Sequence, residues 1–307
     1  MVAQDQTDRS RGCLLGLAVG DAVGTTVEFQ PRGSFEPLTD LVGGGPFDLP
    51  AGAWTDDTAM ALCLGVSLRE VGGFNPQDQM QRYCEWWQQG YLSSTGVCFD
   101  IGNTVQSALR GYQQTGDPLA GSTHPRSAGN GSIMRLAPVP LFYYPDRLKI
   151  LQFSAESSRT THGAAVCLDA CRVLGEALYW ALSGAEKAEI LARMSEMVLE
   201  TPEVMAIARG EYQRKPIAAI RGSGYVVESL EAALWCFWAT GSYREAVLAA
   251  ANLGDDADTT AAICGQIAGA FYGESGIPEA WLACLVMRSE IAELAEALGQ
   301  AVPSAEI

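Results

Sequence analysis

Residues 254–260, GDDADTT, lead directly into the apolar run 261–272, and residues 54–58, WTDDT, lead in the same way into the apolar run 59–68. Acidic and hydroxyl side chains are ordinary at helix N-termini, because they accept hydrogen bonds from free amides and complement the helix dipole. Both stretches therefore predict the start of a helix. The two predicted helix starts share adjacent carboxylates followed by threonines.

The carboxylates at these helix starts exceed what capping requires. One Ser, Thr, Asp or Asn caps a helix, whereas each stretch carries two or three carboxylates, which repel one another unless a cation intervenes. Neighbours such as Asp56 and Asp57, or Asp256 and Asp258, can converge only where the backbone enters the helix. All these ligand atoms are hard oxygens, and with two histidines in the chain an imidazole-rich zinc site is not expected. The sequence favours Mg²⁺ or Mn²⁺ over surplus capping, although spacing alone does not bring the stretches together.

Apolar side chains recur at helical spacing in most long segments, and strands are hard to find. The last segment is typical, because Pro278 begins it and Gly299 ends it. No repeat or linker divides the chain, so we predict an all-α protein with one compact domain of orthogonal helices over residues 1–307. The predicted helices are 164–182, 187–199, 202–213, 226–239, 244–252 and 279–298, and the predicted glycine- and proline-rich loops are 41–52, 121–131 and 215–224.

The composition is that of a globular protein, with 48% hydrophobic and 18% charged residues. A formal net charge of −16 argues against a nucleic-acid-binding surface, which needs clusters of Lys and Arg. No apolar run reaches the roughly 20 residues of a membrane span, since Glu228 and Glu231 interrupt even the run 226–238. The polar segment 1–11 does not resemble a secretory signal. We expect a cytoplasmic protein.

The chain has nine cysteines. Their odd number and their scatter through apolar segments favour reduced thiols over disulfides. Cys167 and Cys171 are four residues apart, so they are expected on one face of a helix as buried thiols rather than as metal ligands.

Some further residues allow a structural and a functional interpretation. Glu28 is a lone acid in apolar surroundings, and such residues are more commonly on the surface. The glycine-rich segment 129–132 could be a plain turn or could present backbone amides to a phosphate. His162 could hydrogen-bond to the backbone or contact a ligand, and Tyr225 could belong to the core or stack on a ligand. His124 lies in a polar loop, and we assign it no role.

A series of short motifs extends over nearly the whole chain. Residues 20–24 read GDAVG, followed by VEF at 27–29, and the two acidic stretches at 54–58 and 254–260 follow in order. This ordered set resembles the ADP-ribosylglycohydrolase family. Further segments that are similar to the family are DIGNT at 100–104, GNGSIMR at 129–135, THG at 161–163 and GYV at 224–226.

The resemblance implies a compact all-α fold with two Mg²⁺ or Mn²⁺ ions in a central cleft. Glu28 resembles the mobile-loop glutamate that the family places near the metals. Asp100 resembles the acid that members cleaving ADP-ribosylarginine place beside the scissile bond. The implied metal ligands are Thr55, Asp56, Asp57, Asp256, Asp258 and Thr259. The expected substrate-binding residues are Gly129, Asn130, Gly131 and Ser132 at the diphosphate, His162 beside the ligand, and Tyr225.

The activity that the resemblance implies is hydrolysis of the bond between ADP-ribose and a modified protein side chain. Such a reaction passes through an oxocarbenium-like state and needs stabilised charge, a positioned water and help for the leaving group. Glu28 or Asp100 would act as the acid or base, while the other orients the substrate. Asp100 favours the arginine linkage. The alternatives are hydrolysis of serine-linked, polymeric or O-acetyl ADP-ribose, non-catalytic ADP-ribose binding, and another metal-dependent hydrolase such as a phosphoesterase.

Overall fold

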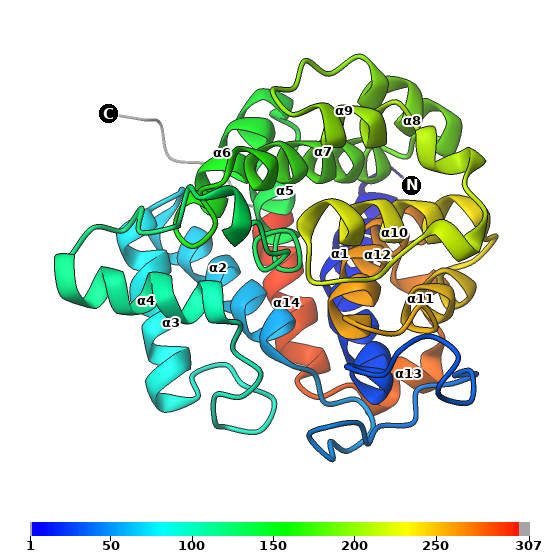
Figure 1. Cartoon of the computed structure of the whole chain (residues 1–307), viewed down its shortest axis with the longest axis horizontal. Coiled ribbons are helices and arrows are strands. Elements are labelled where there is room, and N and C mark those ends of the chain that lie inside the picture. The colour runs from blue at the N-terminus through cyan, green and yellow to red at the C-terminus, as the bar shows by residue number, and fades with distance from the viewer. Residues whose placement is uncertain (1, 301–307) are drawn as a thin grey trace.

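The computed structural model describes residues 2–300 and confirms the predicted all-α fold (Figure 1). Within these residues the chain forms helices and short 3₁₀ helices, and its only strand-like pairings are isolated β-bridges. The predicted domain, 1–307, extends at both ends beyond the described residues. No helix in residues 2–300 combines the length and the apolar character that crossing a membrane requires.

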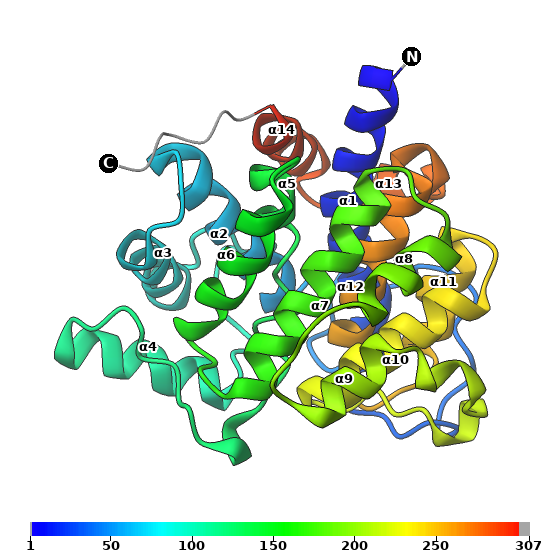
Figure 2. The ribbon, with the colours of Figure 1, turned by 90° about the horizontal axis from the view of Figure 1, so that it is seen from above.

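Two helices far apart in the sequence form the centre of the fold. Helix α1 (Val2–Gly24) and helix α12 (Ala257–Tyr272) pack against each other, and both views show them side by side (Figures 1 and 2). Gly12 of α1 lies against Gly269, and Gly24 lies against Ala257, so the two helices run antiparallel. The end of α1 therefore lies beside the beginning of α12, which is one of the two acidic helix starts.

Glycines at every fourth position bring the backbones of α1 and α12 into contact. Gly12, Gly16, Gly20 and Gly24 share one face of α1. A β-carbon added to Gly16 would lie 2.4 Å from the carbonyl oxygen of Gly265, and one added to Gly20 would lie 2.2 Å from that of Ala261. Atoms cannot approach so closely, so these positions admit only glycine. This glycine seam sets how near the end of α1 comes to the start of α12.

The other helices surround this central pair. Helix α2 (Asp56–Val71) and helix α14 (Arg288–Gly299) contact α1 and each other. Helices α7 (Ala165–Leu182), α10 (Val226–Ala239) and α11 (Tyr243–Ala251) contact α12. The remaining elements are α3 (Pro76–Gln89), α4 (Asn103–Thr115), α5 (Pro138–Tyr143), α6 (Arg147–Arg159), α8 (Lys187–Ser195), α9 (Pro202–Ala208) and α13 (Glu279–Cys284), with the 3₁₀ helices η1 (Thr25–Val27), η2 (Pro125–Ser127), η3 (Glu211–Arg214), η4 (Ile217–Ala219) and η5 (Glu274–Gly276).

Local sequence patterns predict most helix boundaries, and α10 coincides with the predicted range 226–239. The prediction of one helix over 279–298 is wrong, because the chain breaks between α13 and α14, where Met287 has a left-handed backbone with φ 59°. The amide of Val286 donates to the carbonyl of Gly52, and the indole of Trp54 donates to the carbonyl of Val286, both at 3.0 Å. Contacts with the segment before α2 thus replace the helical hydrogen bonds that periodicity predicts.

Two other predicted helices are too long. A helix is predicted over 187–199, whereas the observed helix, α8, ends at Ser195. The predicted range 202–213 divides into α9 and η3, because Gly210 between them has a left-handed backbone with φ 74°. The expected buried thiols are confirmed, since Cys167 and Cys171 are fully buried and unpaired on α7.

Candidate active site

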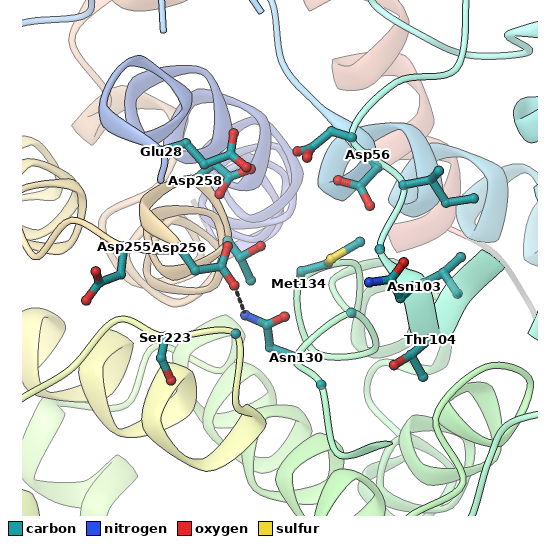
Figure 3. A pocket seen from close by; sticks show the side chains of 18 of the residues that line it. Glu28, Asp56, Asn103, Thr104, Asn130, Met134, Ser223, Asp255, Asp256 and Asp258 are labelled. Carbon is teal, nitrogen blue, oxygen red and sulfur yellow. Dashed lines mark hydrogen bonds between the residues drawn. The ribbon is translucent and has the colours of Figure 1, made fainter. Parts of the chain in front are cut away.

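A cavity of about 850 Å³ opens where the starts of α2 and α12 meet the segment that follows α1 (Figure 3). Its wall is built from segments that are distant in the sequence, and acidic side chains dominate its polar part. The polar side chains of the lining are Glu28, Asp56, Asp100, Asn103, Thr104, Asn130, His162, Ser223, Asp255, Asp256, Asp258 and Thr259.

Asp21, near the end of α1, organises the start of α2. Its buried carboxylate accepts hydrogen bonds from the amide and the hydroxyl of Thr55, each at 2.9 Å. The same carboxylate accepts from the amide of Thr58 at 3.0 Å and from its hydroxyl at 2.6 Å. Thr55 is the N-cap residue of α2, yet its own side chain caps no amide of that helix. A carboxylate from another helix thus performs the capping, and this links the positions of α1 and α2.

The two acidic helix starts contact each other directly. The hydroxyl of Thr55 has two possible acceptors, Oδ2 of Asp258 at 3.2 Å and the carboxylate of Asp21 at 2.9 Å. The hydroxyl of Thr259 donates a hydrogen bond to Oδ2 of Asp57 at 3.3 Å. Spacing in the sequence does not establish whether these stretches meet. The tertiary structure brings the two helix starts into contact, and four of the six predicted metal-binding residues line the cavity: Asp56, Asp256, Asp258 and Thr259.

Two buried carboxylate oxygens of this cluster lack a hydrogen-bond donor. The Oδ1 atoms of Asp57 and Asp258 are buried and accept no hydrogen bond from residues 2–300, which is a costly state for a charged acceptor. In the described part of the chain no Lys or Arg side chain lines the cavity. Oxygen donors with surplus negative charge suit a hard divalent cation. The cluster could therefore hold a metal.

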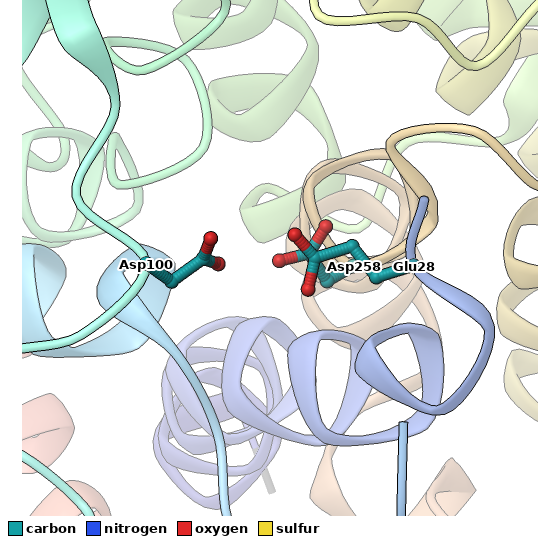
Figure 4. Close-up of side chains that lie close together, drawn as sticks. All are labelled: Glu28, Asp100 and Asp258. Carbon is teal, nitrogen blue, oxygen red and sulfur yellow. The ribbon is translucent and has the colours of Figure 1, made fainter. Parts of the chain in front are cut away.

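Glu28 and Asp100 approach this cluster from two different loops. Glu28 directly follows η1, is 3% exposed, and accepts a hydrogen bond of 3.4 Å from the hydroxyl of Thr25. Asp100 lies in the loop before α4 and points toward Glu28 and Asp258 from the opposite side (Figure 4). One carboxylate oxygen from each of these three residues lies within 4.8 Å of the other two. Both predicted catalytic carboxylates therefore lie at the same point of the cavity.

Burial and mutual repulsion raise the pKa values of these carboxylates. Desolvation, followed by the charges of Asp100, Asp256 and Asp21, raises the pKa of Glu28 to about 9. Desolvation and the charges of Asp21 and Asp256 raise the pKa of Asp100 to about 7. Desolvation is also the largest cause that raises the pKa values of Asp56, Asp57 and Asp258 well above the ordinary range. The cluster by itself therefore retains protons, and a bound cation would displace them.

Three residues of the cavity lining have a left-handed backbone. They are Phe29 with φ 62°, Asp100 with φ 59° and Asp255 with φ 57°. Residues other than glycine seldom adopt this conformation, which costs on the order of 1–3 kcal/mol. Phe29 donates its amide hydrogen to the carbonyl of Asp255 at 2.7 Å, and the amide of Asp255 donates to Gln30 at 2.8 Å. Paired backbone hydrogen bonds thus hold the Glu28 loop against the start of α12.

An aromatic bridge joins the loops that carry Glu28 and Asp100. Phe47 packs edge-on against Phe29, with ring centroids 6.4 Å apart, and against Phe99, with centroids 5.1 Å apart. Phe29 follows Glu28 directly, and Phe99 precedes Asp100 directly. Phe47 therefore contacts the residue next to each of the two carboxylates.

The glycine-rich segment 129–132 forms another part of the cavity wall. The side-chain amide of Asn130 donates to Oδ2 of Asp256 at 2.7 Å and to the hydroxyl of Ser229 at 2.8 Å (Figure 3). Gly129, Asn130 and Gly131 line the cavity, whereas Ser132 lies behind it, where its hydroxyl accepts from the thiol of Cys171. The segment is therefore anchored to the acidic cluster through Asn130.

His162 and Tyr225 lie in different surroundings. His162 lines the cavity beside Gly129 and Gly131, and its ring is buried. Tyr225 is 41% exposed, pairs with Gly129 in a β-bridge, and does not belong to the cavity lining. Its exposure excludes the first of the two interpretations of Tyr225, that it is a core residue. His124 lies on the surface, as expected, and its Nδ1 accepts from the amide of Arg126.

Sequence patterns do not identify every residue that builds the site. Asp21 occurs in the GDAVG segment, but its hydrogen bonds to Thr55 and Thr58 depend on a helix that begins more than thirty residues later. Asn103, the first residue of α4, and Ser223, in the loop before α10, also line the cavity. The GNGSIMR segment also contains Arg135, which is buried and not part of the lining. Only the folded arrangement indicates a role for these residues.

Known proteins resemble this chain over its length. The family model described as ADP-ribosylglycohydrolase matches residues 3–306. The ADP-ribosylarginine hydrolase Tri1 of Pseudomonas putida (strain GB-1) is 44% identical over 306 residues, which cover 100% of this chain and 82% of that protein. The ADP-ribosyl-[dinitrogen reductase] glycohydrolase of Rhodospirillum rubrum is 32% identical over 287 residues, which cover 92% of each chain.

A solved structure supports the same relationship. It is titled "ADP-ribosylglycohydrolase-related protein complex", has 42% sequence identity to this chain, and superposes with a TM-score of 0.86 over 97% of this chain and 99% of that one. Agreement in sequence, fold and the ordered motifs around the acidic cluster has one explanation. The chain belongs to the ADP-ribosylglycohydrolase family.

Proposed function

We propose that this chain hydrolyses the N-glycosidic bond between ADP-ribose and an arginine side chain of a modified protein and releases ADP-ribose. The observation that supports this proposal is the meeting of both acidic helix starts with Glu28 and Asp100 at one point of the cavity. A relative of 44% identity is named an ADP-ribosylarginine hydrolase, which favours the arginine linkage. We also propose that residues 1–307 form one domain around this cavity, since its lining extends from Glu28 to Thr259.

The acidic cluster, in this proposal, holds two Mg²⁺ or Mn²⁺ ions. The proposed ligands offer only oxygen atoms, and buried oxygens of Asp57 and Asp258 have no other partner among residues 2–300. When bound, the cations would offset the negative charge of the cavity and act as Lewis acids toward the ribose hydroxyls and a water. The proposed ligands are Thr55, Asp56, Asp57, Asp256, Asp258 and Thr259.

Glu28 and Asp100 supply the acid–base chemistry in this proposal. Water adds to the anomeric carbon, the bond from that carbon to the guanidine nitrogen breaks, and the departing guanidine gains a proton. One of the two carboxyl groups takes a proton from the water or gives one to the guanidine, and the other orients the substrate. Their proximity supports this division, because oxygens of Glu28 and Asp100 lie within 4.8 Å.

The cavity suits a dinucleotide-like ligand in size and in lining. Its volume of about 850 Å³ falls within the range of roughly 300–1,000 Å³ that is usual for small-molecule sites. Gly129 and Gly131 leave their backbone amides accessible beside His162, which suits contact with a diphosphate. We propose that residues 129–132 and His162 bind this part of ADP-ribose, with Ser132 acting through the backbone, and that Tyr225 contacts the ligand from the rim.

The deciding experiment is release of ADP-ribose from an arginine-ADP-ribosylated protein with Mg²⁺, with Mn²⁺ and with a chelator. We expect release that depends on the metal and is lost in Asp256→Ala. Asp117→Ala is the matched control, because Asp117 is an exposed acid in a loop outside the cavity lining. Metal-independent release, or full activity of Asp256→Ala, would contradict the proposed metal site.

A panel of defined linkages tests the choice of arginine. Serine-linked, polymeric and O-acetyl ADP-ribose are offered under the same conditions, and intact ADP-ribose is distinguished from ribose phosphate by mass spectrometry. Hydrolysis of serine linkages alone would overturn the arginine assignment. Tight binding of ADP-ribose without release from any substrate would make the chain a binding protein, and released ribose phosphate would make it a phosphoesterase.

A further inference from the structure

Arg135 carries a buried positive charge close to the cavity. Its side chain is 1% exposed, and no carboxylate in residues 2–300 forms an ion pair with it. The guanidinium lies over the ring of Tyr83, 4.6 Å from the centroid, and Nη2 donates to the hydroxyl of Thr161 at 2.6 Å. A longer contact of 3.4 Å joins Nη2 to Thr160. Burying a charge without a counterion costs free energy, which raises the question of what the hydrogen bonds of Arg135 do in this place.

The hydroxyl of Thr161 connects Arg135 to His162. A guanidinium only donates hydrogen bonds, so the Thr161 oxygen accepts from Arg135. The same oxygen lies 2.8 Å from Nδ1 of His162. If this oxygen accepted from both partners, its own hydrogen would have no acceptor among residues 2–300, so the arrangement that satisfies every group points this hydrogen to Nδ1. The ring accepts at Nδ1, and a neutral ring that accepts there carries its proton on Nε2.

The backbone around His162 fixes where the ring points. The amide of His162 donates to the carbonyl of Ser158 at 2.7 Å, and the hydroxyl of Ser158 donates to the carbonyl of His162 at 2.8 Å. Nε2 faces the glycine-rich segment, because a β-carbon added to Gly129 or Gly131 would lie 3.3 or 3.2 Å from it. Nε2 has no hydrogen-bond partner within residues 2–300, and the residue lines the cavity. Burial, followed by the charge of Arg135, lowers the pKa of the ring to about 3, so the ring is neutral.

We propose that Arg135 and Thr161 are positioning residues that hold His162 as the neutral Nε2–H tautomer, ready to donate a hydrogen bond to an oxygen acceptor in the cavity. The identity of that acceptor, an oxygen of the ADP-ribose unit, rests on the function proposed above. The position of the proton on Nε2 does not rest on the proposed function, because it follows from the contacts among Arg135, Thr161 and His162. A donor suits this position, since diphosphate oxygens only accept hydrogen bonds and would be repelled by a bare nitrogen lone pair.

The tautomer is measured directly by two-bond ¹H–¹⁵N correlation spectra of ¹⁵N-labelled protein without ligand. The chain has only two histidines, so the spectrum of His124→Gln assigns His162 unambiguously. We expect a protonated Nε2 and a bare Nδ1 throughout the range from about pH 6 to about pH 9. A protonated Nδ1, or a doubly protonated ring, would overturn the proposal whichever linkage the protein cleaves.

Two substitutions at Thr161 test whether the tautomer governs binding. Thr161→Val removes the hydroxyl at nearly constant volume, and Thr161→Ser keeps it. For the valine variant we expect mixed tautomers and a Kd for ADP-ribose that rises about tenfold, as the loss of one hydrogen bond to a charged acceptor predicts. The rise should appear in KM with little change in kcat, and the serine variant should match the wild type. Unchanged affinity and an unchanged spectrum in the valine variant would overturn the proposal, and the wild-type spectrum decides it if that variant does not fold.

Discussion

The carboxylate of Asp21, on α1, accepts hydrogen bonds from both the amide and the hydroxyl of Thr55, the residue that caps α2. Because Thr55 is a proposed metal ligand, Asp21 should affect the site without touching the substrate. We expect Asp21→Asn to lower the free energy of unfolding by about 1–3 kcal/mol, since an amide cannot accept every one of these hydrogen bonds. Displacement of the helix start should lower turnover about 100-fold.

Asp8→Asn is the control for this prediction. Asp8 lies on the same helix and accepts two hydrogen bonds from Ser275, both at 2.9 Å, outside the cavity lining. Its substitution should leave turnover unchanged. Chemical denaturation and steady-state kinetics measure both effects, and wild-type turnover in Asp21→Asn would show that Thr55 needs no support from α1.

Asp100→Asn should lower turnover severely and spare ADP-ribose binding. Asn tolerates the left-handed backbone of this position, so the substitution removes the carboxylate without new strain. A residue that transfers a proton contributes about 10²–10⁴-fold to the rate, and this is the loss we expect. Asp48→Asn is the matched control, because Asp48 is exposed and has φ 52°. Calorimetry and product release measure the two effects, and unchanged turnover would remove Asp100 from the mechanism.

Phe47→Ala should weaken the coupling between the Glu28 and Asp100 loops. Removing the ring abolishes its edge-on contacts with Phe29 and Phe99. Both carboxylates should then become less well positioned, and we expect kcat to fall about tenfold with little change in stability. Val42→Ala, an exposed apolar residue of the same loop region, should have no effect. A kcat for Phe47→Ala that equals that of the wild type would show that the two loops are held independently.

Gly20→Ala should destabilise the fold by about 2–3 kcal/mol or more, because a β-carbon there would lie 2.2 Å from the carbonyl oxygen of Ala261. Gly111→Ala is the opposite case. Gly111 lies within α4, and its added β-carbon would meet nothing closer than 3.7 Å, so alanine should stabilise the protein by about 0.5–1 kcal/mol. Denaturant titration measures both variants. Equal stabilities of the two variants would contradict the close packing of α1 and α12.

With a chelator present, the protein should lose stability as the pH rises from about 6.5 to about 8. The pKa values of Asp100 and Glu28 are raised to about 7 and about 9 in the folded protein. The folded state therefore binds more protons than the unfolded state in this window, so a rise in pH favours the unfolded state, which holds fewer protons. His162 contributes with the opposite sign, but only between its lowered pKa of about 3 and its ordinary value of 6.5.

Thermal unfolding with and without Mg²⁺ checks this expectation. In the chelator, Tm should fall by about 5 °C between about pH 6.5 and about pH 8, because unfolding releases roughly one to two protons in this range. Saturating Mg²⁺ should flatten the profile, because a cation replaces the protons of the cluster. Parallel profiles with and without Mg²⁺ would show that the cation binds elsewhere or not at all.

Local patterns predict where most of the expected helices begin, because periodicity and capping depend on neighbouring residues. The range 226–239 coincides with α10, and both acidic stretches begin helices. Periodicity fails between α13 and α14, where Gly52 and Trp54 form hydrogen bonds with Val286. These partners are more than two hundred residues away, so no local pattern contains them.

The sequence by itself determined the all-α class, the acidic helix starts, the oxygen character of the proposed metal ligands and the motifs of the family. Only the tertiary structure decided that Thr55 meets Asp258 and that Asp21 caps α2. It also decided that Thr161 contacts both Arg135 and His162, and that Ser132 lies behind the cavity. The physical reason is that composition and spacing specify which groups a segment offers, whereas their partners depend on how closely distant helices pack, as the glycines between α1 and α12 allow.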